Sequence, residues 1–278
     1  MKKMLKLFVA TAVICISSLH ADTELDVASL ASVEGKEVSS YLRGAYMDVA
    51  TAKSKLESAG YTIVGEYNIA KGGTTILFTD NALKAEASKP NRGYVALERL
   101  YVDEAKKQIT ITNPIYFGKA YMQGEYNHAV FYKELQTLTK AFAGLKASED
   151  RLKFNDLETY HYMMGMPYYQ DMLKLGSGSD LLAKAKQSQT ALFELKISDK
   201  VTLLGFDFDK RTNKFPSKIG LENGVVMPYV VVVENDNAKA LSGYYYIALS
   251  YPLLPMAQFT KISDVPGAIE TLLAKPFE

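Results

Sequence analysis

The sequence predicts an α+β protein of two similar domains, each an antiparallel sheet with helices packed on one face. Three observations predict this class. Strand-like segments rich in β-branched and aromatic residues come in pairs, helix-like segments flank them, and the same order of segments occurs twice. A repeat this long indicates a duplicated domain, because solenoid repeats have about 20–50 residues. We expect the two domains to pair within one chain as an internal pseudo-dimer, with a homodimer as the alternative.

Composition and turn residues divide the chain into four parts. Residues 1–21 are predicted to be a signal peptide, residues 22–145 the first repeat, residues 146–178 a connector and residues 179–278 the second repeat. The connector is rich in tyrosine and methionine. It ends at Gly176-Ser177-Gly178, which is typical of a flexible joint.

The first part has the pattern of a secretory signal peptide. Lys2, Lys3 and Lys6 precede an apolar run over residues 7–19, and Ala21 is a small residue at the expected cleavage point. The run is shorter than the roughly 20 residues that span a bilayer, although an uncleaved anchor is the alternative. We expect cleavage near Ala21, a periplasmic location and no transmembrane segment after cleavage.

Removal of residues 1–21 changes the charge and the thiol content. Three of the 32 Lys and Arg residues leave, so 29 remain against 31 Asp and Glu residues, a net charge of −2. The lack of a basic excess argues against nucleic-acid binding. Cys15 is the only cysteine and leaves as well, so disulfides and thiolate chemistry are excluded.

The first repeat begins with a helix. Asp48 is the expected N-cap, Ala52 and Leu56 follow at helical spacing, and Gly60 stands where the helix would end. Asn127 precedes the clearest amphipathic stripe, which predicts a helix over residues 127–145. The remaining predicted elements are strands at 38–42, 61–67 and 74–78, a helix at 81–88, and a hairpin of strands at 94–103 and 108–112.

The second repeat follows the same order. We expect a helix at 181–188, strands at 190–197 and 201–208, a hairpin of strands at 229–234 and 244–252, and a final helix from about 263. An offset of 128 places Thr62 on Thr190 and Phe78 on Phe206. An offset of 138 places Pro114 on Pro252, at the ends of the two hairpins.

These segments resemble the bacterial domain of unknown function (DUF) 302 family in two copies. The likeness covers residues 48–121 and 179–259, with a helix ending in LESAGY, a strand pair, a hairpin and an apolar helix. The family's usual Gly-x-Pro after the second strand is replaced by Thr79-Asp80-Asn81 and by Asp207-Phe208-Asp209. The resemblance implies a compact domain that pairs with a like domain, and it implies no activity.

Several chemical motifs are missing. The sequence contains no GxSxG, GxxxxGK[ST] or GxGxxG, and Lys71-Gly72-Gly73 lies between two strands and is expected to be a turn. Asp207, Asp209 and Asn213 have the odd spacing of a calcium loop, but the glycine and closing glutamate that such a loop requires do not follow. We interpret this segment as a solvated loop.

The stretch with the strongest metal-binding character is YHYMMGMPYYQDM, residues 160–172. It contains His161, Met163, Met164 and Met166, and imidazole with thioether suits Cu(I). The alternative is that these side chains fill a seam between the two halves, because methionine packs well into irregular gaps. Four glutamates are candidates for acid–base chemistry but are expected to be exposed charges: Glu57, Glu66, Glu98 and Glu194.

The sequence therefore predicts an exported binding protein without enzymatic activity and without a cofactor. The expected partner is a small apolar or amphipathic molecule in a tyrosine-lined groove, or another protein, since 19 tyrosines are present. A copper-binding protein centred on His161 is one alternative. An enzyme with an unrecognised carboxylate or tyrosine site is the other.

Overall fold

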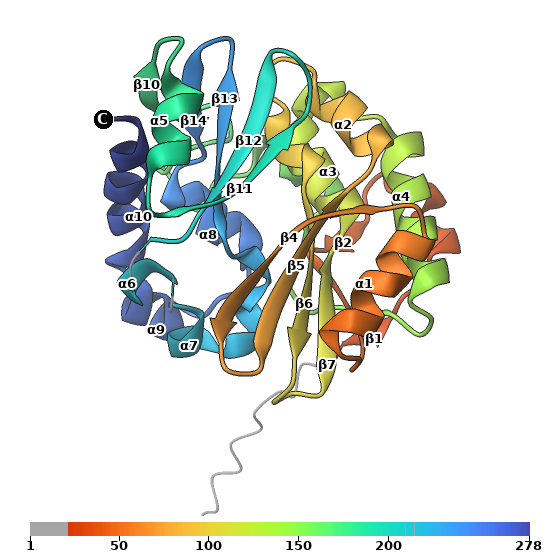
Figure 1. The fold of residues 1–278 in the computed structure, drawn as a ribbon. Coiled ribbons are helices and arrows are strands. Elements are labelled where there is room, and N and C mark those ends of the chain that lie inside the picture. Colours follow the sequence, from red (N-terminus) through yellow and green to blue (C-terminus); the bar gives the residue numbers. More distant parts are fainter. Residues whose placement is uncertain (1–21, 209, 214) are drawn as a thin grey trace, which may run out of the picture.

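A computed structural model describes residues 22–208, 210–213 and 215–278 (Figure 1). The predicted signal peptide and Asp209 lie outside the described residues. The fold is α+β with antiparallel sheets and helices, as predicted. Within the described residues, no helix is both long enough and apolar enough to cross a membrane.

The first sheet has seven strands in the order β1-β8-β3-β7-β6-β5-β4. These strands are β1 (Thr23–Glu24), β3 (Tyr41–Ala45), β4 (Thr62–Ala70), β5 (Gly73–Thr79), β6 (Glu98–Asp103), β7 (Gln108–Thr112) and β8 (Lys146–Ala147). The helices of this half are α1 (Val49–Ser58), α2 (Asn81–Ala87), α3 (Pro114–Met122) and α4 (His128–Ala141). β2 (Glu37–Ser39) and β9 (Arg151–Lys153) form a separate pair.

The second sheet has five strands in the order β10-β14-β13-β12-β11. These strands are β10 (Leu173–Ser177), β11 (Ala191–Lys196), β12 (Val201–Phe206), β13 (Tyr229–Glu234) and β14 (Asn237–Ala240). The helices are α5 (Leu181–Gln187), α6 (Lys210–Asn213), α7 (Pro216–Ile219), α8 (Gly243–Ser250), α9 (Met256–Phe259) and α10 (Val265–Ala274).

Several elements follow directly from their sequence signals. The Asp48 carboxylate accepts a hydrogen bond from the Thr51 N–H at 2.8 Å, which caps α1 at the predicted residue. In α4, Phe131, Leu135 and Leu138 are buried, so the predicted stripe packs onto the core. The strand pair of the first half and its turn at Gly72 are also confirmed.

The two sheets share strand order and register. The order β3-β7-β6-β5-β4 in the first sheet corresponds to the order β10-β14-β13-β12-β11 in the second. If these five strands are numbered along the chain within each half, both orders read 1-5-4-3-2. Ile63 pairs with Phe78, and Ala191 pairs with Phe206, at the predicted offset of 128. A bulge follows directly after each of these two pairs, so the likeness extends to an irregularity.

The predicted strand at 244–252 is wrong, because this segment forms helix α8. β13 turns at Asn235 and Asp236, which have φ values of +48° and +59°, and returns as the short strand β14. Ser242 then caps α8 by accepting a hydrogen bond from the Tyr244 N–H at 3.2 Å. The segment is almost wholly buried, and tertiary packing overrides the strand propensity of its aromatic residues.

Two further predictions change with this correction. The offset of 138 is wrong, since Ile109 lies in a strand and Ile247 in a helix. The N-caps Asn113 of α3 and Ser242 of α8 instead align at an offset of 129. Gly176 and Ser177, predicted to be a flexible joint, lie in β10 and pair with β14.

Two 3-10 segments cross reciprocally from one half to the other. η2 (Gly93–Ala96) packs against β12 and β13, and η5 (Leu221–Val226) packs against β5, β6 and β7. A Cβ on Gly93 would lie 2.9 Å from the Val232 methyl carbons, and one on Gly224 would lie 2.9 Å from the Tyr101 ring. Val232 and Tyr101 occupy the same register position in their sheets, so the two glycines pack at equivalent positions.

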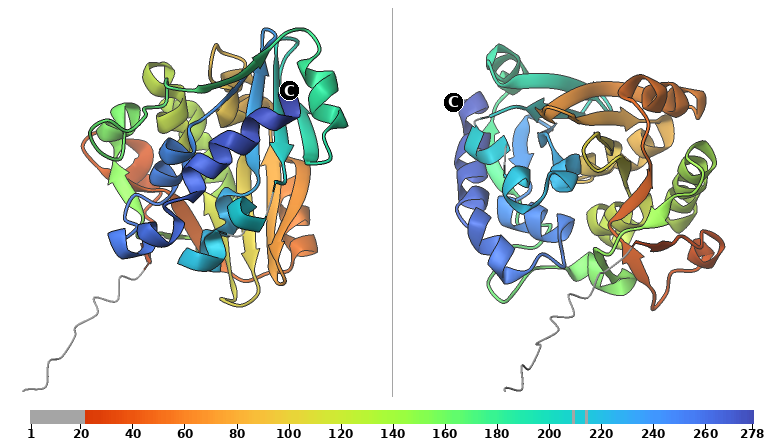
Figure 2. Two further views of the ribbon diagram at one scale, coloured as in Figure 1. Left: turned by 90° about the vertical axis from the view of Figure 1, so that its left-hand side faces the viewer. Right: turned by 90° about the horizontal axis from the view of Figure 1, so that it is seen from below.

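The edge strands of the two sheets also meet. β4 and β11 lie next to each other, in orange and teal in the view from below (Figure 2). We call the whole zone of contact between the two sheets and their helices the seam.

Candidate functional site

Buried tyrosines bridge the seam by donating to main-chain carbonyls. The Tyr116 hydroxyl in α3 donates to the Leu249 carbonyl of α8 at 2.8 Å, and the Tyr94 hydroxyl donates to the Val230 carbonyl at 3.0 Å. Leu249 lies in the last turn of α8, where carbonyls lack helical partners. Burial raises the pKa of Tyr116 well above its ordinary value, so its phenol stays protonated at neutral pH.

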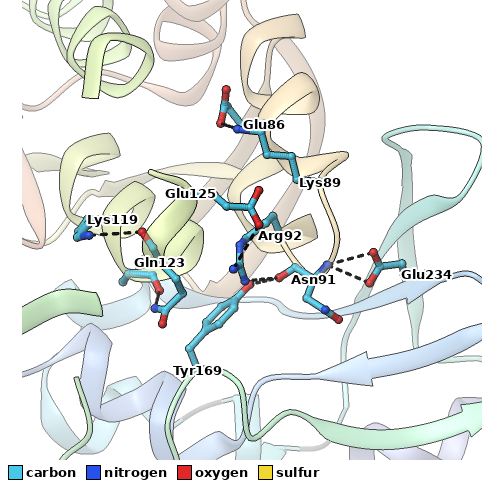
Figure 3. A network of polar contacts seen from close by, with 10 residues as sticks. Glu86, Lys89, Asn91, Arg92, Lys119, Gln123, Glu125, Tyr169 and Glu234 are labelled. Carbon is cyan, nitrogen blue, oxygen red and sulfur yellow. Dashed lines mark hydrogen bonds and ion pairs between the residues drawn. The ribbon is translucent and has the colours of Figure 1, made fainter. Parts of the chain in front are cut away.

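One end of the seam is filled by a polar network, which we call the closed end (Figure 3). The Asn91 N–H donates to both oxygens of Glu234 at 3.0 and 3.2 Å. The Tyr169 hydroxyl donates to the Asn91 carbonyl at 2.6 Å. The Arg92 guanidinium lies 5.6 Å from the centre of the Tyr169 ring and 3.7 Å from Glu125. A ring, a cation and two carboxylates therefore lie together at this end.

The other end of the seam holds a cleft of about 560 Å³, which we call the open end. Residues from both halves line it, as expected for ligand sites at domain interfaces. Its charged lining residues are Arg43, Glu149, Asp150 and Glu222, and its aliphatic ones are Ile219, Leu253, Leu254 and Pro255. Its remaining lining residues are Asn223, Tyr251 and Gln258.

The charges of the open end are only partly paired. Arg43 Nη1 lies 3.3 Å from an Asp22 oxygen, and Lys106 Nζ lies 3.7 Å from Glu222. The Glu149 carboxylate has no hydrogen-bond or ion-pair partner among the described residues.

Asp150 is the most enclosed carboxylate of the open end. Its Oδ1 accepts a hydrogen bond from the Leu253 N–H at 3.3 Å. Burial raises the pKa of this carboxyl, and the Leu253 N–H and the Arg43 guanidinium oppose the rise. The positive charge of Arg43 therefore interacts with both Asp150 and Asp22.

The two ends of the seam are formed by corresponding segments with different local backbone. Asn91 and Arg92 directly precede Gly93, and Glu222 and Asn223 directly precede Gly224. The Arg92 N–H donates to the Lys89 carbonyl at 3.1 Å, and the Asn223 N–H donates to the Gly220 carbonyl at 3.1 Å. Asn91 has a φ of +59° and lies before η2, whereas Glu222 and Asn223 lie inside η5.

Two carboxylates are buried beneath α4, away from the cleft lining. The Thr112 hydroxyl donates to Glu98, and the Tyr61 hydroxyl donates to Glu134 at 2.8 Å. Burial raises the pKa of Glu98 to about 8 and that of Glu134 to about 7. The expectation that Glu98 is an exposed strand charge is therefore wrong. Its position in a strand could not reveal that α4 covers it.

The other predicted carboxylates lie on the surface or pair with lysines. Glu57 is exposed on α1. Glu66 lies 2.5 Å from Lys53 Nζ, and Glu194 lies 2.7 Å from Lys186 Nζ. The structure does not bring these glutamates together with Glu98.

In the methionine-rich stretch the methionines lie toward the surface, whereas Tyr169 is buried in the seam. His161 Nδ1 is 2.8 Å from the Met163 carbonyl, and the His161 ring lies 4.4 Å from the Tyr168 ring centre. Met163 is 44% exposed, Met164 is 94% exposed, and Met166 is half-buried. Among the described residues, no three His, Cys, Asp or Glu side chains group as a metal site would require. Copper binding by His161 and its methionines stays a prediction.

The segment with calcium-loop spacing takes part in the seam. Tyr67 from the first half donates its hydroxyl to Asp207 at 2.8 Å, and the Asn213 amide also donates to Asp207. The interpretation as a solvated loop is therefore wrong for Asp207 and Asn213, because these contacts hold them against the first sheet.

Comparison with other proteins gives no assignment. No protein-family model, no curated protein and no solved structure matches this chain. The resemblance to the DUF302 family stays a prediction.

Proposed function

We propose that the chain is an exported, non-enzymatic binding protein that holds a small ligand in the cleft at the open end of the seam. The cleft of about 560 Å³ carries this proposal, because both halves line it and its charged groups are incompletely paired. A site with an aliphatic wall and a few polar groups is typical of small-molecule recognition.

The proposal includes an internal pseudo-dimer of two repeats. Three features support it: the two sheets share their strand order, they share a register with the same bulge, and Gly93 and Gly224 pack reciprocally against the opposite half. In a pseudo-dimer the two ends of the seam are related by an approximate two-fold axis. One end has then been filled by its own side chains and the other left open to a ligand.

Binding is favoured over catalysis by the positions of the titratable groups. Glu98 and Glu134 have pKa values near neutrality but line no part of the cleft. Neither His128 nor His161 lines it either. Asp150, whose pKa burial also raises, lines the cleft without Glu98, Glu134 or a histidine beside it as a second acid–base group.

Export is proposed from the signal-peptide pattern of residues 1–21. The chain joins the fold immediately afterwards, since Thr23 pairs with Ala147 in the first sheet. Cleavage near Ala21 would therefore leave every described strand in place.

A cleft-filling variant tests the proposal. The protein is recovered from the periplasm of expressing cells, and mass spectrometry determines its N-terminus. Its amide NMR spectrum is then recorded with a mixture of small neutral, anionic and cationic molecules. We expect shifts at Asp150, Asn223 and Leu254. Gln258→Trp, which places an indole into the cleft, should abolish them, whereas Thr260→Trp on the exposed side should not.

Two results would overturn the proposal. Shifts that cluster away from the cleft would place the ligand elsewhere. Shifts that survive in Gln258→Trp would show that the hollow is not the binding site.

A further inference from the structure

We propose that the open end selects an organic cation with an apolar body: an ammonium or guanidinium group attached to an alkyl or aromatic group. This inference rests on the proposed function and specifies the chemical class of the ligand. Two observations carry it, the charge balance of the cleft and its aliphatic wall, and the closed end serves as a comparison.

The charge balance is negative after every ion pair is counted. Arg43 and Lys106 supply two positive charges, and Asp22, Glu149, Asp150 and Glu222 supply four negative ones, which leaves −2. Cleavage before Asp22 would add one positively charged α-amino group, which would change the net charge to −1. Carboxylates in a partly enclosed cleft bind a cation more strongly than the same groups in open water do, because the local dielectric is lower.

The aliphatic wall lies beside these carboxylates. Leu253 is 52% exposed, and its own N–H holds Asp150, so apolar surface and acceptor are adjacent. Leu254, Pro255 and Ile219 continue this wall within the cleft. A ligand must therefore place a hydrocarbon group against the wall while its charged end reaches Glu149 and Asp150.

The closed end shows how the chain fills the opposite end of the seam. There the chain supplies an aromatic ring, Tyr169, and a cation, Arg92, that lies over it. At the open end Asn223 precedes Gly224 as Arg92 precedes Gly93, so an uncharged side chain takes the sequence position of the cation.

The ring of Tyr169 has no counterpart at the corresponding sequence position. Leu173 in β10 and Leu42 in β3 occupy corresponding positions in the two sheets, and Tyr169 lies four residues before Leu173. The residue four before Leu42 is Val38, which pairs with Leu152 in a separate ladder and does not line the cleft. The open end has its own ring and cation, Tyr251 and Arg43, yet a cleft remains, and its excess of carboxylates together with its aliphatic wall defines the proposed ligand.

Three probes with the same hexyl chain test the inference. Hexylammonium, hexanol and heptanoate carry a cationic, a neutral and an anionic end group on that chain. Their Kd values are measured by amide NMR titration on the periplasmic protein, following Asp150 and Leu254. We expect hexylammonium to bind at least about tenfold more tightly than hexanol, and heptanoate to bind most weakly.

A charge-matched pair of variants locates the effect. Glu149→Gln with Asp150→Asn should reduce hexylammonium affinity about tenfold or more and leave hexanol affinity unchanged. Glu57→Gln with Asp199→Asn removes the same net charge far from the cleft and should leave both affinities unchanged, because salt screens distant charges.

The outcomes separate this inference from the proposed function. Equal binding of the three probes in the cleft, or preference for heptanoate, overturns the cation inference and leaves a binding protein. A cation preference that survives in the Glu149 and Asp150 variant also overturns it. Absence of binding by every probe, together with absence of cleft shifts in the small-molecule mixture, overturns both.

Discussion

The closed and open ends of the seam are formed by corresponding segments of the two halves and have different contents. At the closed end, Tyr169 and Arg92 lie in the seam, and Asn91 is bonded to Glu234. At the open end, a cleft of about 560 Å³ remains, with Glu149 unpaired among the described residues. Asn91 has a φ of +59° before η2, whereas Glu222 lies inside η5, so the ends differ in local backbone as well as in side chains. The cleft is suited to a ligand from outside the chain.

The largest expected effect is a pH dependence of stability that only the first half contributes. Glu98 begins β6, and its counterpart at the start of β13 is Tyr229, so only the first half buries a carboxyl here. The pKa of Glu98 in the fold is about 8, above its ordinary 4.5. The folded protein therefore binds more protons than the unfolded chain between these pH values. The contribution of Glu98 to the free energy of unfolding is therefore greatest below pH 4.5 and falls as the pH rises to about 8.

Glu98→Gln removes this contribution. Between pH 4.5 and 8, its free energy of unfolding should rise relative to wild type by on the order of a few kcal/mol. Urea unfolding at a series of pH values measures this. Glu57→Gln, at an exposed site on α1, is the control and should follow the wild-type curve. Parallel curves for Glu98→Gln and wild type would show that Glu98 titrates normally.

The next effect tests whether the two crossings of the seam are equivalent. Gly93→Ala and Gly224→Ala should each lower the free energy of unfolding by about 1–3 kcal/mol, because the added Cβ would meet Val232 or Tyr101 at 2.9 Å. In Gly65→Ala the nearest atom outside the adjacent residues lies 3.8 Å away, so little change is expected. Thermal and urea unfolding provide the measurement, and tolerance of either crossing substitution would contradict the reciprocal packing.

A pair of glutamates compares the two ends directly. Glu234→Ala removes both acceptors of the Asn91 N–H and should cost about 1–2 kcal/mol. Glu222→Ala removes only a long, exposed ion pair with Lys106 and should cost less than about 1 kcal/mol. Equal losses in urea unfolding would mean that the open end is held together as firmly as the closed end.

The smallest effect concerns equivalent tyrosines in α3 and α8. Tyr116→Phe loses the hydrogen bond to the Leu249 carbonyl and should cost about 1 kcal/mol. Tyr245, at the offset of 129, has a buried hydroxyl without a partner among the described residues, so Tyr245→Phe should be neutral or stabilising. Calorimetric unfolding measures the stability of both variants. A larger loss of stability in Tyr245→Phe than in Tyr116→Phe would contradict this expectation.

Local signals predicted much of the fold. The cap at Asp48, the stripe of α4 and the strand pairs at offset 128 are all read from neighbouring residues, so they could be found without coordinates. The second hairpin failed because a run of aromatic residues favours a strand locally, whereas complete burial made it helix α8.

The candidate site could not be predicted in this way. Arg43, Asp150 and Leu254 are far apart in the sequence and share no motif, and only the pairing of the two halves brings them to one cleft. The burial of Glu98 beneath α4 has the same origin, since nothing in the strand itself indicates what covers it. Sequence patterns report on local structure, and the open end is formed by tertiary structure.

A crystal structure of the periplasmic protein with hexylammonium tests the central claim most directly. We predict the hexyl chain against Leu254 and Pro255, with the ammonium nitrogen within hydrogen-bonding distance of Glu149 or Asp150. A cleft closed by its own side chains, or a probe bound only elsewhere, would contradict the account of the open end as a ligand site.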